Sequence, residues 1–430
     1  MSDNPLVSIG VPVFNGAKTL EKSLRAILDQ EYKNIEVIIS DNASTDATAQ
    51  ICQSLQARDH RIQYVRNKTN MGMANNFNAV VHRSQGKYFM WSAHDDYRDA
   101  SFIAKCVKQL ESNERAVICG SYVAFINEEG QKFDPRPYHY FRPQDMNSSD
   151  FIRSYLARYG CYEMIYGMFR LQNLKASMMI QEVFCPDYLM CFQLLLQGEL
   201  ELVEEELLYY KWNPKTVDHY AREVAQDDQA YEAMAAAPFS QLIGNFVKLV
   251  TESPRFSEVE KASEKEKMIQ GMLEEASHII TPFIEEVKPY FPQTLLSPPL
   301  LYAFCEARYL QGKTIEEAVA ATKASCGVSL ADVREVYIWG AGMQGITVYS
   351  LCQRYRVNIV AYVDPLMPAG LTRHQLPVYS LTDFQALQEK PFVIVAEQVR
   401  EAEQQLNQLG YKKFKDYYIQ DSTKPFLFGC

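Results

Sequence analysis

Short apolar segments alternate with amphipathic ones over about the first hundred residues, and this alternation limits the folds open to the chain. Four runs rich in β-branched and aromatic residues, at 7–14, 35–39, 62–65 and 88–91, are typical of strands. Between them, apolar residues recur three or four positions apart, which indicates helices. Because the strands are apolar almost throughout, both faces of their sheet must be covered. The sequence therefore predicts an α/β fold with a parallel sheet between helices.

Polar residues follow each of the four predicted strands. The carboxyl ends of parallel strands meet along one edge of a sheet, and ligands of such sheets bind beyond that edge. We therefore expect four polar groups to converge on one site. They are Asn15, Asp41, the loop 67–76 and the pair Asp95 and Asp96.

The two adjacent carboxylates of Asp95 and Asp96 come just after the fourth strand. Carboxylates beside a buried strand are costly unless a cation meets them. Hard oxygen ligands of this kind suit Mg²⁺ or Mn²⁺, which would in turn hold a substrate diphosphate. The alternative is a helix cap, because Asp95 or Asp99 could cap a helix that begins near Ser101. The convergence of the four polar groups favours the metal site.

Taken in order and at their spacings, these segments resemble family 2 glycosyltransferases of the GT-A fold over roughly residues 5–215. The segments that carry the resemblance are 7–15, 30–46, 70–72, 86–88 and 94–96. In that family, the loop after the first strand and the Asp after the second hold the nucleotide base. The resemblance implies that Asp41 accepts a hydrogen bond from the imide N–H of uracil or thymine, and that the acidic motif holds ribose and metal.

The resemblance implies two sets of binding residues. The nucleotide-sugar set is Pro12, Val13, Phe14, Asn15, Asp41, Asn70, Gly72, Asn76 and Asp95, and the metal set is Asp96, Asp95 and His219. This chain departs from the family at two places: Ala93 stands where the family often has Asp, and Asn42 stands where it often has a second Asp. Because Ala93 lacks the carboxylate, the alternative is that the chain is a catalytically inactive nucleotide-sugar-binding or scaffold protein.

Glycosyl transfer also needs a base for the acceptor hydroxyl, and a well-placed carboxylate contributes roughly 10²–10⁴-fold in rate. The stretch 185–188, ahead of the apolar helix expected at 189–196, resembles the family segment that carries this base. Asp187 is the candidate, and the same residue could cap the helix. Glu182 and Glu163 are weaker alternatives.

We expect three parts: a GT-A domain at 1–219, a helical connector at 220–330 and a second Rossmann-like α/β domain at 331–430. The connector would pack the two domains together. Its alternative role is to bind the acceptor or to associate with a second copy of the chain, so an oligomer is also possible on the sequence. The last part has a dinucleotide fingerprint between a strand and a helix, with an acid after the next strand, at Gly340, Gly342, Gly345 and Asp364. It resembles small domains appended to sugar-modifying enzymes, in which the nucleotide site is often vestigial. We favour a vestigial site over a bound NAD-like ligand.

The net charge of −10 argues against general nucleic-acid binding. No basic leader and no apolar run near the roughly 20 residues of a membrane span is evident, so we expect a cytoplasmic chain with at most peripheral contact at the inner face of the membrane. The resemblance implies a metal-dependent, inverting enzyme that moves a sugar from a UDP- or dTDP-sugar. Its acceptor would be a glycan, a lipid-linked molecule or a protein in bacterial surface polysaccharide or glycoconjugate assembly. An NAD-dependent oxidoreductase run by the last domain is the other alternative.

Overall fold

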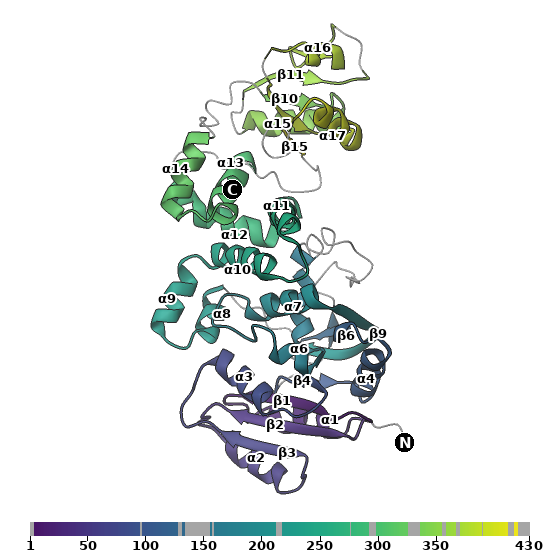
Figure 1. The fold of residues 1–430 in the computed structure, drawn as a ribbon, viewed down its shortest axis with the longest axis vertical. Coiled ribbons are helices and arrows are strands. Elements are labelled where there is room, and N and C mark those ends of the chain that lie inside the picture. The colour runs from purple at the N-terminus through teal and green to yellow at the C-terminus, as the bar shows by residue number, and fades with distance from the viewer. Residues whose placement is uncertain are drawn as a thin grey trace. The chain divides into compact units, whose positions relative to one another are not determined.

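The computed structural model describes most of the chain, and the chain divides into two compact units, Met1–Met268 and Ile269–Cys430 (Figure 1). The described residues are 4–94, 97–127, 131–133, 155–156, 159–211, 217–275, 277–291, 298–325, 336–354, 358–366, 370–388, 390–411 and 417–419. The expected division into three parts at 219 and 330 stays a prediction.

The first unit is built on a mixed sheet whose strand order is β3-β2-β1-β4-β8-β6-β9-β5, with β7 beside β6. The four predicted strands are present and parallel: β1 (Val7–Val13), β2 (Ile35–Asp41), β3 (Ile62–Arg66) and β4 (Tyr88–Trp91). The remaining strands are β5 (Tyr97–Arg98), β6 (Ala116–Ile126), β7 (Lys132–Phe133), β8 (Met168–Arg170) and β9 (Glu199–Lys211). Because β8 pairs antiparallel with β4, the sheet changes direction after its fourth parallel strand.

Helices cover both faces of the parallel strands, as the apolar strands require. Helices α1 (Leu20–Leu28), α2 (Thr48–Gln56) and α4 (Phe102–Ser112) share one apolar core with β1 to β4. Helix α3 (Met73–Arg83) packs on the other face of β1. A Cβ atom on Gly10 would lie 2.5 Å from the Val80 side chain, so the glycine permits this close approach.

Helix α7 (Pro186–Gln197) carries the predicted base and lies almost wholly buried. It begins after Cys185, whose φ is +51°, and Pro186 takes a first-turn position where its missing N–H costs nothing. The rings of Tyr188 and Phe192 pack edge-on against Phe246 of α10 (Pro238–Glu252). The first part of the expected connector therefore packs onto α7 within the first unit. The neighbouring elements are η2 (Tyr159–Tyr166), α6 (Leu171–Lys175), α8 (Val217–Val224) and α9 (Asp228–Ala236).

The second unit follows α11 (Glu258–Glu275), which crosses the boundary between the units. Its helices before the sheet are α12 (Ser277–Val287), η3 (Lys288–Tyr290), α13 (Pro298–Cys305), η4 (Glu306–Leu310) and α14 (Ile315–Ser325). Its six-stranded sheet has the order β12-β13-β11-β10-β14-β15 and is parallel except for β12. The predicted second α/β domain is therefore confirmed as a fold.

The sheet of the second unit alternates with helices along the chain. Its strands are β10 (Val336–Trp339), β11 (Ile359–Val363), β12 (Thr372–Arg373), β13 (Leu376–Tyr379), β14 (Phe392–Val395) and β15 (Tyr417–Ile419). Its helices are α15 (Met343–Arg354), α16 (Leu381–Gln385) and α17 (Val399–Gln408). Trp339 at the end of β10 is fully buried in its core, and its ring packs edge-on against Phe384 of α16.

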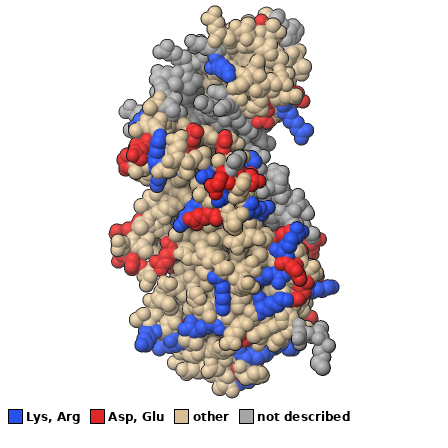
Figure 2. All heavy atoms as spheres, in the orientation of Figure 1, with Lys and Arg blue, Asp and Glu red and all other residues tan. Residues whose placement is uncertain are grey.

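Two surface properties bear on partners. On the face drawn in Figure 2, both basic and acidic side chains lie on the surface of the first unit. Among the described residues, no helix combines the length and the apolar character that crossing a membrane requires.

Candidate functional site

The ends of the first three strands lie level with one another. The parallel register pairs Val13 with Asp41, and Asp41 with Arg66. Backbone hydrogen bonds extend this row, because the N–H of Asn42 donates to the Val13 carbonyl at 2.8 Å and the N–H of Asn67 donates to the Asp41 carbonyl at 2.8 Å. The structure thus brings the polar groups after β1, β2 and β3 to one edge of the sheet, where a ligand of such a sheet binds.

Asp41 is the most buried ionisable group of this edge, with an exposed fraction of 0%. Its Oδ1 atom accepts from the N–H of Ser44 at 2.8 Å, and its Oδ2 atom accepts from the Tyr64 hydroxyl at 2.7 Å. The Nε atom of Arg66 lies 3.4 Å from Oδ2. Burial, and then the hydrogen bond to Asp41, raise the pKa of Tyr64 well above its usual range, so this hydroxyl stays a donor.

Arg66 is the most exposed neighbour of this carboxylate among the three named here. Its side chain is 50% exposed, whereas that of Asp41 is wholly covered. One of its terminal nitrogens donates to the Ser44 carbonyl at 2.7 Å. A ligand group that is to reach Asp41 would therefore displace Arg66 more readily than Tyr64 or the backbone of Ser44, because a half-exposed side chain keeps access to water. Neither Tyr64 nor Arg66 was among the residues predicted from the sequence.

Asn15 joins the loop after β1 to the loop after β2. Its φ is +52°, in the left-handed region that asparagine tolerates. Its N–H donates to the Ser44 hydroxyl at 2.9 Å, and its side-chain oxygen accepts from the N–H of Thr45 at 2.8 Å. Of the predicted residues just before it, Pro12 and Val13 are buried in β1, while Phe14 is 46% exposed. Phe14 and Asn15 are therefore the exposed residues of this stretch, and Phe14 offers the larger side-chain surface.

Asn42 organises the loop before α3. Its amide nitrogen donates to the Asn70 side-chain oxygen at 2.7 Å and to the Gly72 carbonyl at 3.2 Å. Its amide oxygen accepts from the N–H of Met71 at 2.9 Å. An aspartate could accept but could not donate, so the amide that departs from the family pattern has a structural reason here. Gly72 itself has a φ of +79°, which suits glycine.

Asn76 is buried behind this loop, with an exposed fraction of 4%. Its amide nitrogen donates to the Ser40 carbonyl at 3.1 Å, and its amide oxygen accepts from the Ser40 hydroxyl at 2.7 Å and from the Asn67 amide at 3.1 Å. These contacts hold the end of β2 in place. A direct contact of Asn76, Asn70 or Gly72 with a nucleotide stays a prediction.

The acidic motif is anchored on both sides. Before it, the Ser23 hydroxyl of α1 donates to the Ala93 carbonyl at 3.0 Å, and Nδ1 of His94 lies 2.9 Å from the Thr19 hydroxyl. After it, Arg98 donates to the Trp91 carbonyl at 2.7 Å, among other contacts. Asp95 and Asp96 themselves lie outside the described residues. The anchors define where the loop leaves and rejoins the sheet.

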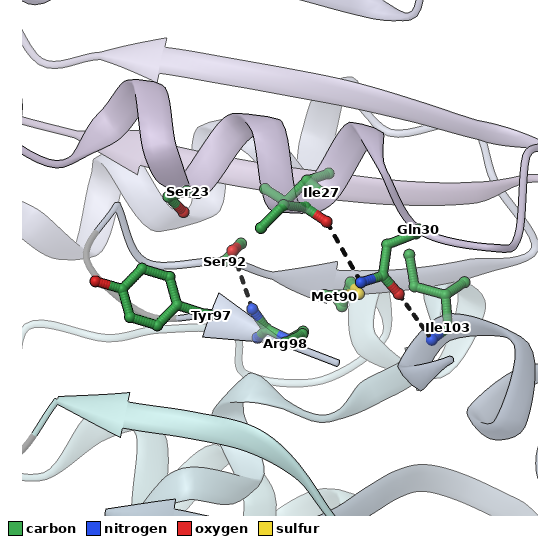
Figure 3. Close-up of a pocket in the computed structure, with 9 residues that line it drawn as sticks. Ser23, Ile27, Gln30, Met90, Ser92, Tyr97, Arg98 and Ile103 are labelled. Carbon is green, nitrogen blue, oxygen red and sulfur yellow. Dashed lines mark hydrogen bonds between the residues drawn. The ribbon is translucent and has the colours of Figure 1, made fainter. Parts of the chain in front are cut away.

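A small cavity lies beside Ser92 and Arg98, and Figure 3 shows these two side chains facing each other there between Tyr97 and Gln30. Arg98 donates to the Ser92 hydroxyl at 2.9 Å. The cavity volume of about 10 Å³ is close to what one water molecule needs, so it is too small for a sugar. The cavity lies among residues of α1, β4 and β5.

The fit of a divalent cation depends on residues that are not described. Asp95 and Asp96 are among them, and the side chain of His219 in α8 is another. Within the described part of the chain, no group of three His, Cys, Asp or Glu side chains gathers as metal ligands would. The metal set stays a prediction.

Asp187 lies half-buried in the first turn of α7, where the exposed N–H groups favour a negative charge. Burial raises the pKa of the neighbouring Cys185 thiol, and the Asp187 charge adds to this. Of the alternatives, Glu182 accepts from the Asn75 amide of α3 at 3.2 Å, and Glu163 is 8% exposed in a largely apolar cavity. Asp187 remains the candidate base.

The predicted glycine loop of the second unit follows β10. Gly340 has a φ of +105°, a conformation that requires glycine, and a Cβ on Gly345 would collide with the Gly340 carbonyl. Asp364 follows β11 and is 3% exposed. Its Oδ2 atom accepts from the N–H of Ala341 at 3.0 Å. The structure therefore brings the four predicted residues together around one tight turn.

Known proteins resemble the first part of the chain. Residues 8–170 match the model of the family described as glycosyl transferase family 2. An uncharacterized glycosyltransferase of Haemophilus influenzae is 35% identical over 129 residues, which are 30% of this chain and 40% of that protein. Glycosyltransferase GlyA of Streptococcus pneumoniae is 31% identical over 124 residues, 29% of this chain and 18% of that protein. The chain thus spans less than half the length of these relatives.

A solved structure supports the fold. The crystal structure of S. aureus TarS 1–349 in complex with UDP-GlcNAc superposes with a TM-score of 0.50 at 13% identity, over 74% of this chain and 90% of that one. At this identity the likeness bears on the fold alone, which in the first unit is a mixed α/β sheet. Residues 8–170 of this chain are therefore a glycosyltransferase domain of family 2 with the GT-A fold.

Proposed function

We propose that this chain is an inverting, metal-dependent glycosyltransferase that uses a UDP- or dTDP-sugar. The observation that carries the proposal is the buried Asp41 carboxylate, which stands level with the ends of β1 and β3 inside a family 2 domain. The buried carboxylate is a hydrogen-bond acceptor and the half-exposed arginine beside it is a donor, so together they can bind a ligand that offers both a donor and an acceptor. The remaining steps of the reaction are assigned to the residues predicted from the sequence.

The base of the donor is recognised by a match of donors and acceptors. Uracil and thymine present an imide N–H between two carbonyl groups. Asp41 accepts from the N–H, and Arg66, which lies 3.4 Å from Asp41, donates to a neighbouring carbonyl once it has moved aside. Cytosine has an acceptor in place of the imide N–H and would face the carboxylate with a lone pair. Phe14, at 46% exposure, offers its ring to the base.

The transfer itself is a single displacement. Asp187 takes the proton of the acceptor hydroxyl while the oxygen of that hydroxyl attacks the anomeric carbon. The bond from the anomeric carbon to the diphosphate oxygen breaks, which inverts the configuration. Asp96, with Asp95 and His219, would hold Mn²⁺ or Mg²⁺, and such a cation stabilises the charge of the leaving diphosphate. The hydrogen bonds at Ala93 and Arg98 hold the described residues on either side of this acidic pair.

The acceptor is a hydroxyl group of a glycan, a lipid-linked molecule or a protein in surface polysaccharide or glycoconjugate assembly. We place the reaction in the cytoplasm, at the inner face of the membrane when the acceptor is lipid-linked. TarS, which shares the fold, was crystallised with UDP-GlcNAc, so UDP-sugars come first in a donor screen. The absence of a carboxylate at Ala93 keeps a second candidate, a nucleotide-sugar-binding protein without turnover.

The test is a thermal-shift screen of UDP-, dTDP-, GDP- and CDP-sugars with and without Mn²⁺, followed by an assay of donor hydrolysis. We expect stabilisation by UDP- or dTDP-sugars that increases with Mn²⁺, and turnover that EDTA abolishes. Asp96→Ala should remove the effect of Mn²⁺, whereas Asp29→Asn, at an exposed position after α1, should not. Full turnover by Asp96→Ala in EDTA would contradict metal dependence, and saturable binding without hydrolysis or transfer would favour the second candidate.

A further inference from the structure

The glycine loop of the second unit already holds an anion from its own chain. The Oε1 atom of Glu397 accepts hydrogen bonds from the N–H groups of Gln344 at 2.8 Å and Gly345 at 3.2 Å. Its Oε2 atom accepts from the N–H of Gly342 at 3.1 Å. In a dinucleotide-binding loop, backbone N–H groups at this place face the phosphates of the ligand. Here they face a carboxylate.

These N–H groups have no partners within their own helix. Helix α15 begins at Met343, and the first N–H groups of a helix lack intrahelical acceptors. The partial positive charge at this end of the helix favours a negative group. Glu397 supplies that group at no cost in translational freedom, because it belongs to the same chain.

The main chain of Glu397 is fixed to the strand that leads into the loop. The N–H groups of Ala396 and Glu397 both donate to the Trp339 carbonyl, at 2.9 and 3.2 Å. Trp339 ends β10, and β14, which precedes Glu397, pairs with β10 in parallel register. The strand order of the sheet therefore places this carboxylate beside the loop.

The glycines of the fingerprint make room for Glu397. A Cβ atom on Gly340 would lie 2.5 Å from the Cβ of Glu397. A Cβ atom on Gly342 would collide with its carboxylate, 2.5 Å from Oε1. The glycines of the fingerprint thus allow the Glu397 side chain, and not a ligand, to approach the loop closely.

The acid of the fingerprint, Asp364, is also engaged, at the place where a dinucleotide-binding domain contacts the ribose. Oδ1 of Asp364 accepts from the N–H of Leu366 at 3.0 Å, and Oδ2 accepts from the N–H of Ala341 at 3.0 Å. With an exposed fraction of 3%, Asp364 offers little surface to a sugar hydroxyl. Both recognition groups of the fingerprint are therefore bound to the protein itself.

We infer that Glu397 occupies the phosphate position of this loop, so that the second unit does not bind NAD or another dinucleotide. A ligand phosphate would have to expel the carboxylate, because two anions cannot share the same three donors. The loop is an anion site that its own chain has closed. This inference stands apart from the proposed glycosyl transfer, which uses the first unit.

The experiment titrates the full chain with inorganic phosphate and with NAD⁺ by calorimetry. Glu397→Ala removes the internal anion, and Glu401→Ala, an exposed acid on α17, is the control with the same change of charge. We expect no saturable NAD⁺ binding by the wild type or by Glu401→Ala. Glu397→Ala should bind phosphate roughly tenfold more tightly or better, because the binding-competent state no longer has to be created. The double variant Glu397→Ala with Gly342→Val should lose this gain, which assigns it to the loop.

Two results would overturn the inference. One is micromolar NAD⁺ binding by the wild type that Gly342→Val abolishes. The other is equal phosphate affinity of Glu397→Ala and Glu401→Ala. The comparison of the wild type with Gly342→Val does not use Glu397→Ala, so it decides the question even when Glu397→Ala does not fold. Phosphate or nucleotide bound by the first unit is common to all variants and cancels in the comparison.

Discussion

The carboxylate of Asp41 allows the sharpest test, because the structure gives all the partners that its removal would leave behind. In Asp41→Ala, the N–H of Ser44 and the hydroxyl of Tyr64 lose their acceptors. Ser44 is 2% exposed, so water cannot readily replace Asp41 there. An unsatisfied buried donor costs about 1–3 kcal/mol. With the full cost at Ser44 and a smaller one at the partly exposed Tyr64, we expect a loss of about 3 kcal/mol.

Two further variants divide this loss. Asp41→Asn keeps an acceptor for Ser44, and the Tyr64 hydroxyl can turn to accept from the new amide, so the loss should be only about 1 kcal/mol. Tyr64→Phe removes one donor and leaves Asp41 bonded to Ser44 and close to Arg66. In a double-mutant cycle, Asp41→Ala and Tyr64→Phe together should cost less than their sum by about 1 kcal/mol, the smaller share of the loss assigned to Tyr64.

The assay must resolve the first unit from the second, because a chain of two units need not unfold in one transition. Hydrogen exchange of peptides that cover β1, β2 and β3 reports the local free energy of opening there. Peptides of β10 and β14 serve as the internal control and should not change. Unchanged protection of β2 in Asp41→Ala would refute the energetic role assigned to these contacts.

The same variants test recognition of the base. Asp41→Ala should weaken UDP by about 1–3 kcal/mol and CDP much less, since only uracil has an imide N–H to lose its acceptor. Because the stability loss is common to both ligands, the ratio of the two affinities isolates the contact with the base. Equal losses for UDP and CDP in calorimetry would show that Asp41 acts only as a structural group.

Two further predictions concern other residues of the site. Asp187→Asn should lower glycosyl transfer by roughly 10²-fold or more while donor binding, measured by calorimetry, survives; a fully active variant would move the base to Glu182 or Glu163. Asn42→Asp should destabilise the loop before α3 by about 1–3 kcal/mol, because a carboxylate would face the Asn70 oxygen and the Gly72 carbonyl in place of an amide donor. Faster hydrogen exchange of residues 67–76 would confirm this, and unchanged exchange would mean that the loop does not depend on the amide.

The sequence by itself determined the layered fold of both units. Apolar periodicity is a local property, so the strands β1 to β4 and the helices between them could be predicted from neighbouring residues alone. The same alternation, with polar residues after each strand, was enough to expect Asn15 and Asp41 at one edge of the sheet, because strands that run parallel end together.

The partners of each side chain were decided by tertiary structure. Tyr64 and Arg66 meet Asp41 only because β3 pairs with β2 in one particular register. Glu397 is 55 residues from Gly342, and no local pattern marks it as the anion of that loop. The glycine fingerprint indicates only which backbone conformation the loop can adopt. Whether the N–H groups of that backbone face a ligand or a carboxylate of the same chain depends on contacts between distant segments, which sequence spacing does not contain.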